Sequence, residues 1–437
     1  MKITLYQANQ GDCLLLTARD GTTLLVDGGM KGSYRKHVAR SIGTMARTGT
    51  QIDLVCVSHI DRDHINGILQ LMDDLAAWRV FDYQRGSGNT IFPCPKGIRP
   101  PAVRAIWHNA FKDQVADNSG AIEDQLVANM KLFNMSGRAL KPGVAQHARH
   151  YDQLATGVRE GLQLSNRIGR NQLNIPTNQP FGGGLVSIED PQHPPPKFSH
   201  GGMDLFLKGP FKEDLEKLRD EWNDWLRKNQ EAVQAIREGA AEDEELFPLD
   251  EGQLILSSLL ALAAELGNRN AVTTPNLASI MLLVEEAGKT VLLTGDGHAD
   301  DILKGLEAHG KLDNAGRIHV DVLKVQHHGS EHNIHEDFCE AVTADHYVIC
   351  ANGSHRNPDL DVLQTIIDSR LGAAAGDTNA GRPFKLWFNS SANRAGTEKR
   401  TEHMEQVEKL VKDEATRNRW RIKHRFLTGG SKLTFEI

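Results

Sequence analysis

Short apolar runs bounded by turn residues recur along this chain and predict its strands. Near the N-terminus, such runs occupy residues 3–6, 13–16 and 23–26, and Gln10-Gly11-Asp12 and Arg19-Asp20-Gly21 separate them. This pattern predicts an antiparallel meander over residues 2–27. Its last strand ends at Asp27-Gly28-Gly29, where Asp27 can hold a neighbouring loop by hydrogen bonds, although a plain turn explains the motif equally well.

A polar loop follows the next apolar run, which extends from Ile52 to Val57 and predicts a buried strand. This loop carries four side chains of the metal-ligating kind: His59, Asp61, Asp63 and His64. In extended backbone, alternate side chains point to the same side. His59, Asp61 and Asp63 are therefore expected to converge, and His64 is expected to point to the opposite side. Imidazole with carboxylate suits Zn²⁺ or Mn²⁺, and two ions can share such a cluster. An ordinary polar loop is the alternative, which the dense spacing disfavours.

Helical periodicity surrounds this loop and weakens after it. Residues 34–47 are predicted to be helical, and residues 68–79 form a second helix that carries Leu69, Met72, Leu75 and Trp78 on one face. From about residue 80 to residue 200, prolines and glycines interrupt the pattern. A basic stretch lies in this part, at Arg138, Lys141, Arg149, Arg159, Arg167 and Arg170. This stretch is either a lid that faces phosphates or a solvated face of a helix, and charge patterning favours the solvated helix.

The middle of the chain combines one strand with strongly helical sequence. Residues 203–207 predict a strand that ends at Gly209-Pro210, and a helix is expected over residues 211–238. The run from Leu254 to Leu266 is apolar enough that it must be buried or must pack against a partner.

Core-like sequence returns after residue 278, and its strands end in polar loops. Strands are predicted at 279–285, 290–293, 320–325, 347–350 and 385–388, with a helix at 359–371. Thr294-Gly295-Asp296 follows the second of these strands, His327-His328-Gly329-Ser330 follows the third, and Ser354-His355-Arg356-Asn357-Pro358 follows the fourth. Together with the loop at His59, these ligands suffice for two ions, and Asp296 can bridge them with one carboxylate oxygen each.

Composition is that of a soluble globular protein. The chain has 437 residues, of which 39% are hydrophobic and 24% charged, and no apolar run reaches membrane-spanning length. Met1-Lys2-Ile3-Thr4 opens without the features of a signal peptide, and the five scattered cysteines indicate buried thiols in a reducing compartment. We therefore expect a cytoplasmic protein without a membrane partner. The net charge of −7 requires any polyanion to bind at a local basic patch.

Taken in order, four motifs resemble those of metallo-β-lactamase fold hydrolases. They are Asp27-Gly28-Gly29, the loop from His59 to His64, residues 292–296 and residues 323–330. The ComEC-type branch, named for the hydrolase domain of bacterial DNA-uptake proteins, is the most similar, since it has Asp61 where other members carry a second His. Asn276-x-x-Ser279 also matches that branch. The resemblance implies an α/β fold of the four-layer αββα sandwich type, with large, mainly helical insertions.

The resemblance also implies roles for individual residues. His59 and Asp61 would bind one divalent ion, Asp63 and His64 the second, and Asp296 would bridge them. His328 would complete the second site, and His327 would lie beside the first ion as ligand or charge stabiliser. Asp63 would also orient the attacking water. The branch carries His-Pro where this chain has Asn357-Pro358, so His355 is either a substrate-binding or proton-donating residue or a solvated loop histidine.

The resemblance divides the chain into core and insertions. Residues 1–79 form the first half of the core, residues 80–200 an insertion or lid, residues 201–210 a core strand, residues 211–270 a helical insertion, and residues 271–437 the second half with a basic C-terminal strand. In that strand Arg417, Arg419, Arg421, Lys423 and Arg425 alternate with apolar residues. Such a ribbon can track phosphates, and an edge strand kept soluble by charge is an equal alternative.

Three hypotheses for function remain at this point. The first is a metal-dependent phosphoesterase acting on nucleic acid, in a bacterial defence or DNA-processing system. The second is a hydrolase of peptides, lactones or small phosphoesters. The third is a partner-controlled effector in a multiprotein system, with the run from Leu254 to Leu266 in the insertion helices as its docking surface.

Overall fold

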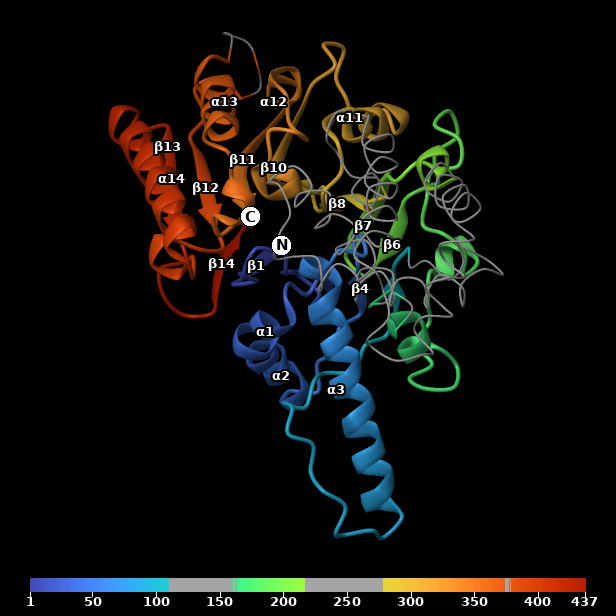
Figure 1. The fold of residues 1–437 in the computed structure, drawn as a ribbon. Helices are drawn as coiled ribbons and strands as arrows, with labels where there is room; N and C mark the ends of the chain where they lie inside the picture. The colour runs from blue at the N-terminus through green and yellow to red at the C-terminus, as the bar shows by residue number, and fades with distance from the viewer. Residues whose placement is uncertain (110–159, 162, 217–277, 374–376, 378) are drawn as a thin grey trace, which may run out of the picture.

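Two facing β-sheets with helices on their outer sides form the body of the protein (Figure 1). The computed structural model describes residues 1–109, 160–161, 163–216, 278–373, 377 and 379–437. The predicted helix beyond residue 216, the apolar run from Leu254 to Leu266 and the basic residues from Arg138 to Arg159 lie outside this described part. Within it, no helix is long and apolar enough to cross a membrane.

The first sheet has six strands in the order β14-β1-β2-β3-β4-β5. Its strands are β1 (Lys2–Tyr6), β2 (Leu14–Thr17), β3 (Thr23–Val26), β4 (Leu54–Cys56), β5 (Ile106–Trp107) and β14 (Lys432–Glu436). The first three form the predicted antiparallel meander, and β4 and β5 continue the sheet in parallel. β14 pairs with β1, so the end of the chain closes the sheet that its beginning opens.

Helices α1 (Lys31–Ser33), α2 (Ala39–Arg47) and α3 (Arg62–Gly86) cover this sheet, and the π-helical turn Tyr34–Val38 joins α1 to α2 (Figure 1). The predicted start of α3 at residue 68 is wrong by six residues. Ile65 and Ile68 are both fully buried and extend the apolar face towards the N-terminus. Asp63 and His64 therefore lie in the first turn of a helix, which fixes their directions more tightly than a loop would.

The second sheet has eight strands in the order β13-β12-β11-β10-β9-β8-β7-β6. They are β6 (Phe198–His200), β7 (Met203–Gly209), β8 (Met281–Glu286), β9 (Lys289–Leu293), β10 (Ile318–Lys324), β11 (Val342–Ile349), β12 (Phe384–Phe388) and β13 (Ile422–Phe426). Strands β9 to β13 run parallel, and β6 to β9 pair antiparallel. Two short strands, β5 and β6, come from the region 80–200 that was expected to be an insertion.

Helices α11 (Ala299–Ala308), α12 (Glu336–Ala341), α13 (Leu360–Leu371) and α14 (Glu398–Arg417) lie on the outer side of the second sheet (Figure 1). The core accordingly has three apolar layers. One joins the first sheet to α2 and α3, one lies between the sheets, and one joins the second sheet to these four helices. Because side chains alternate along a strand, successive residues belong to different layers: Leu24 and Val26 face the other sheet, whereas Leu25 faces the helices. The architecture is the predicted αββα sandwich.

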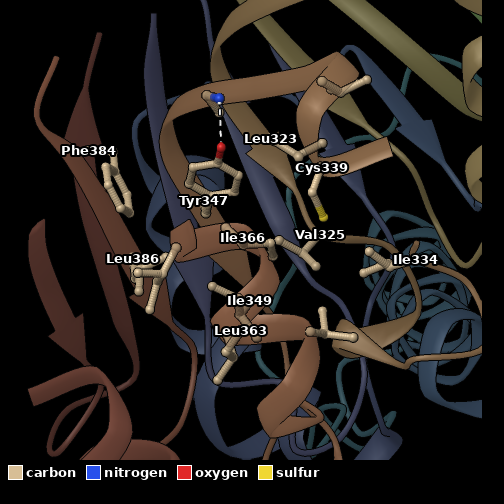
Figure 2. Close-up of a cluster of buried hydrophobic side chains, with 14 of the residues drawn as sticks. Leu323, Val325, Ile334, Cys339, Tyr347, Ile349, Leu363, Ile366, Phe384 and Leu386 are labelled. Carbon is tan, nitrogen blue, oxygen red and sulfur yellow. Dashed lines mark hydrogen bonds between the residues drawn. The ribbon is translucent and has the colours of Figure 1, made fainter. Parts of the chain in front are cut away.

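Figure 2 shows the layer under α13, where side chains from three adjacent strands meet those of the helix. Leu323 comes from β10, Ile349 from β11 and Leu386 from β12. Leu363 and Ile366 come from α13. The one polar group drawn there is satisfied, since the hydroxyl of Tyr347 accepts a 3.0 Å hydrogen bond from the backbone N–H of Ala344. Tight packing of this layer holds the parallel strands in register and so fixes the loops at their ends.

The predicted basic ribbon is wrong in its first half. Arg417 is the last residue of α14, and β13 begins only at Ile422. Trp420, expected on the apolar face, is 90% exposed, and the guanidinium of Arg421 donates 2.8 Å to the carbonyl of Arg370. The helix overrode the alternating pattern because its buried Val407 and Val411 continue an amphipathic face up to the turn. Only Lys423 and Arg425 remain as exposed charges of an edge strand.

Candidate metal centre

Three loops that follow strand ends meet at one edge of the sandwich. They follow β4, β9 and β10, and the last two of these strands are parallel neighbours, so their loops emerge side by side. The first loop comes from the other sheet and is tied across the sandwich, because the N–H of Ile280 donates 2.8 Å to the carbonyl of Ser58. The hydroxyl of Ser279 accepts 3.1 Å from the N–H of Asp296 and fixes the second loop.

Asp27 anchors the first loop, which was one of the two equal alternatives that the sequence left open. Its carboxylate accepts from the N–H and the hydroxyl of Ser58, both at 2.7 Å, and from Nδ1 of His64 at 2.9 Å. The backbone after Asp27 packs directly against α3, where a Cβ on Gly67 would lie 1.9 Å from the carbonyl oxygen of Gly28. Glycine is therefore required at this contact, and the contact sets the position of His64.

Four imidazoles converge on one oxygen of Asp296. Their Nε2 atoms lie at these distances from Asp296 Oδ2: His59 3.7 Å, His64 3.5 Å, His327 3.9 Å and His328 3.5 Å. These separations exceed a good N–H···O hydrogen bond. They match the roughly 3–4 Å between atoms that share one ion at metal–ligand distances of about 2 Å. The arrangement is that of a ligand shell rather than of a hydrogen-bond network.

Each imidazole is oriented by a hydrogen-bond acceptor behind it. Nδ1 of His59 donates 3.0 Å to the hydroxyl of Ser58, whose own proton goes to Asp27. Nδ1 of His64 donates to Asp27, and Nδ1 of His328 donates 2.8 Å to the carbonyl of Cys350. Because Nδ1 is the donor in each case, the neutral ring presents the Nε2 lone pair to the centre, which is the orientation found in metal-ligating histidines.

His327 follows the same rule through Asn333. The amide nitrogen of Asn333 donates 2.9 Å to the carbonyl of Asp296, which turns its oxygen towards Nδ1 of His327. His327 and His328 both have positive φ, at 44° and 58°, a conformation that non-glycine residues seldom adopt. Such backbone strain is concentrated at functional sites, where the surrounding structure maintains it.

The residues present fit a divalent metal. Nε2 of His59, Nε2 of His64 and Oδ1 of Asp296 are buried without a hydrogen-bond partner among the described residues. Two triads have ligand atoms within 4.8 Å of one another: His59, His64 and Asp296, and Asp12, His64 and His328. Leaving several buried polar atoms unsatisfied is costly unless a ligand satisfies them. The donor set of imidazoles and carboxylates suits divalent ions of the Zn²⁺ or Mn²⁺ type.

The charges of the site also favour a bound cation. Burial by itself would lower the pKa of His328, but the carboxylates of Asp296, Asp12 and Asp63 raise it to about 10. The pKa of His64 is likewise raised against burial, by Asp296 and Asp27. Conversely, burial and the neighbouring His64 lower the pKa of His59 to about 3. The carboxylates thus hold positive charge at the centre, and a divalent ion can replace those protons.

Asp61 and Asp63 border the cluster on the side of α3. Oδ2 of Asp61 lies 3.8 Å from Nε2 of His59, and Oδ2 of Asp63 lies 3.5 Å from Nε2 of His328. Burial and the charge of Asp63 raise the pKa of Asp61 to about 7. Burial would raise the pKa of Asp63 too, but its hydrogen bond with His328 keeps that pKa below the ordinary range.

Two sequence-based expectations of geometry are corrected here. His64 does not take the far side, since its ring centroid lies 4.0 Å from that of His59 and both face Asp296. The helical turn at residues 62–64 causes this, because it rotates His64 back towards the strand end. Asp296 also does not present one oxygen to each half of the cluster: Oδ2 faces the imidazoles, whereas Oδ1 lies 3.6 Å from Nζ of Lys324.

His355 is not a member of either triad. It follows β11, its side chain is exposed and its φ is 55°. Asn357, which stands where the ComEC-type branch has histidine, is buried and donates 3.4 Å to the carbonyl of His327. The position therefore supports the His327 loop, and His355 remains a prediction.

Sequence reasoning missed three residues that contact the cluster: Asp12, Lys324 and Asn333. Asp12 was interpreted only as part of a turn, although its Oδ1 lies 3.4 Å from Nδ1 of His328. Lys324 is a charged residue that follows the apolar pair Val322-Leu323 at the end of β10 and breaks the alternation of the strand, which was the available signal. Asn333 follows the His327 loop without a recognisable motif, so only the structure reveals it.

Comparison with known proteins agrees with this site. Residues 6–77 match the family model of the metallo-beta-lactamase superfamily, a segment that contains Asp12, Asp27 and the loop from His59 to His64. No curated protein matches the chain. The α/β fold with its two mixed sheets is consistent with the metallo-β-lactamase fold. The match and the candidate triad of His59, His64 and Asp296 together support a metal-dependent hydrolase.

Proposed function

We propose that this protein is a dinuclear metal-dependent phosphodiesterase that acts on nucleic acid, of the ComEC-type branch. The observation that carries the proposal is the convergence of four imidazole Nε2 atoms on Oδ2 of Asp296. His59 and Asp61 would hold one ion, His64, Asp63 and His328 would hold a second, and Asp296 borders both places. Bound ions of this kind supply an activated hydroxide and polarise a phosphoryl oxygen.

The protein's own residues would hold and orient the reactants. Asp63, at the first turn of α3, has its carboxylate ionised beside His328 and is suited to orient a water molecule at the cluster. Burial and Asp63 raise the pKa of Asp61 to about 7 in the metal-free site, and a bound cation would hold that carboxylate ionised. Asp61 is also the residue that favours the ComEC-type branch.

A nucleic-acid substrate is supported by basic residues at the edge of the sheet that carries the cluster. Strands β10 to β13 are parallel, so the loops that follow them emerge at one edge. Arg356 lies in the loop after β11, the strand that neighbours β10, and Arg394 lies in the loop after β12, one strand further along the sheet. Arg425 is at the corresponding end of β13. A polymer must be held at several phosphates, and this row of loops offers charges beyond the cluster.

The proposal is tested by metal loading and a substrate panel. Purified protein loaded with Zn²⁺ or Mn²⁺ should bind close to two ions and should cleave single- or double-stranded DNA or RNA, or a small chromogenic phosphodiester. A peptide and a lactone complete the panel and represent the alternative hydrolases. Asp296→Asn, which keeps the shape of the side chain, is the matched inactive control.

Two results would contradict this function. A folded protein that binds one ion or none would refute the dinuclear centre. Two bound ions with cleavage of the peptide or lactone alone would retain the metal centre and refute the phosphodiesterase assignment.

A further inference from the structure

A lysine and an aspartate form a buried ion pair directly behind the cluster. Lys324 is the last residue of β10 in the second sheet, and Asp12 lies in the β1–β2 turn of the first sheet. Both side chains are 2% exposed. Nζ of Lys324 contacts Oδ2 of Asp12, so the pair spans the two sheets at the edge where the metal-ligating loops meet.

Each member of the pair contacts the cluster on its own side. Nζ of Lys324 donates 2.8 Å to the carbonyl of Gly295 and lies 3.6 Å from Oδ1 of Asp296. Asp12 approaches the backs of two imidazoles, with 3.4 Å to Nδ1 of His328 and 3.9 Å to Nδ1 of His64. The ammonium thus faces the oxygen of Asp296 that the histidines do not face.

The direct contact of a buried ammonium with a buried carboxylate is that of an ion pair, and the electrostatics agree with it. Burial would lower the pKa of Lys324, but the carboxylates of Asp12 and Asp296 outweigh it and hold the pKa above its usual value. Burial would raise the pKa of Asp12, yet Lys324 and His64 lower it to about 2. A lone ammonium this close to a metal site would repel the ions, whereas an ammonium neutralised by its own carboxylate does not.

We propose that Lys324 and Asp12 are a charge-neutral positioning pair, in which Lys324 holds Oδ1 of Asp296 so that Oδ2 faces the histidines, and Asp12 cancels the charge of Lys324. This inference rests on the proposed metal centre and requires no particular substrate. Without Asp12, the ammonium would be compensated by Asp296 alone and would compete with the metal for that carboxylate. Without Lys324, Asp296 would lose the contact that sets its orientation.

A double-mutant cycle on metal affinity tests the pair. Co²⁺ is titrated into wild type, Asp12→Asn, Lys324→Met and the double variant, with its visible absorption reporting coordination and a competing chelator reporting affinity. Each single substitution should weaken binding about 10–100-fold, the usual effect of removing a group that orients metal ligands. The double variant should lose clearly less affinity than the two single losses combined, because the main effect of Asp12 is exerted through the lysine.

The double variant keeps the test decisive if a single variant does not fold. It has no uncompensated buried charge, so it is expected to fold even where one partner alone does not. Its Co²⁺ affinity should stay about tenfold or more below that of wild type with a changed absorption band, because Asp296 is no longer held. A double variant that binds Co²⁺ as wild type does would overturn the proposal, as would strictly additive losses in the cycle.

A matched control separates positioning from general stability. Asp345→Asn removes a carboxylate that ion-pairs at the opposite end of β10–β11, where it binds His319 and Arg382. It should lower thermal stability and leave Co²⁺ affinity and absorption unchanged. Wild-type protein that binds no Co²⁺ would refute the metal centre itself, whereas two bound ions with additive losses would refute the pair alone.

Discussion

The two ends of strand β10 place histidines in opposite situations. At its start, both nitrogens of His319 are hydrogen-bonded, Nδ1 to the hydroxyl of Thr343 at 2.9 Å and Nε2 to Asp345 at 3.0 Å. Beyond its end, the Nε2 atoms of His327 and His328 lie 3.9 and 3.5 Å from Asp296 Oδ2, outside good hydrogen-bond range. The hydrogen bonds of His319 form a closed network, whereas the Nε2 atoms of His327 and His328 converge on Oδ2 of Asp296.

This difference separates a structural cluster from a ligand site. Both ends of the strand combine histidine with aspartate and a basic residue, so composition alone does not distinguish them. What distinguishes them is where the buried donors and acceptors point. A network that satisfies its own members stabilises the fold, whereas buried lone pairs aimed at one point require something from outside the chain.

The largest effect is expected from Asp296→Asn, which removes the carboxylate on which the Nε2 atoms converge. Turnover of the best phosphodiester substrate should fall by about 10²–10³-fold or more, the scale for losing one charge-stabilising group at a reacting centre. Folding should survive because the amide keeps the shape. Steady-state kinetics with metal analysis measures this, and near-normal turnover would show that the ligand site has been misassigned.

Asp345→Asn, at the closed end, should act on stability alone. It weakens the hydrogen bonds of His319 and Arg382, and the free energy of unfolding should fall by about 1–3 kcal/mol. Burial would raise the pKa of Asp345, but His319 and Arg382 outweigh burial and lower it. The stability that this carboxylate contributes is present above its unfolded-state pKa, and the difference between wild type and variant should shrink as pH falls through the folded-state pKa. Denaturant titrations at several pH values measure both; a drop in metal content would contradict the comparison.

Lys208 offers a third case, a buried charge that belongs neither to a closed network nor to a convergent cluster. It lies on β7, fully buried, and its Nζ has no hydrogen-bond partner among the described residues. Burial and the nearby Lys311 lower its pKa to about 7. Between this folded-state pKa and the unfolded-state pKa near 10.5, the unfolded chain binds more protons than the folded chain. The free energy of unfolding should therefore rise with pH over this range.

The contribution of Lys208 is isolated by Lys208→Met. From pH 7 to pH 9, the stability of wild type should rise by about 2 kcal/mol relative to this variant, since one proton is worth about 1.4 kcal/mol per pH unit. Activity should not change. If the free energy of unfolding changed with pH by the same amount in wild type and Lys208→Met, Lys208 would have a charge partner in the folded protein.

The smallest effect is expected from the exposed charges of β13. Lys423→Glu with Arg425→Glu should reduce binding of DNA or RNA and flatten its salt dependence by about 1–2 units of slope, roughly one for each phosphate that is no longer neutralised. Hydrolysis of a small phosphodiester should be spared. Arg421 is left unchanged because its guanidinium supports the carbonyl of Arg370. Unchanged polymer binding would leave β13 as a solubilising edge strand.

Periodicity by itself determined most of the fold. The meander at residues 2–27, the strands after residue 278 and the order of the polar loops follow from local alternation and turn chemistry, which neighbouring residues encode. The same loops identified the ligand-type residues, because histidine and aspartate after buried strands are conspicuous in sequence. Where local signals compete, prediction failed: α3 begins at Arg62, and α14 extends to Arg417, the first residue of the expected ribbon.

Only the tertiary structure decided how those residues meet. That His64 faces Asp296 depends on the first turn of α3 and on the contact between Gly28 and Gly67. Lys324, which lies 3.6 Å from Oδ1 of Asp296, contacts Asp12, a residue more than three hundred positions before the lysine in the chain and on the other sheet. Contacts between the two sheets cannot be predicted from neighbouring residues in the sequence, because each side chain packs against a partner that is distant in the chain and comes near only on folding. The sequence therefore names the candidate ligands, and the packing of the two sheets sets their directions.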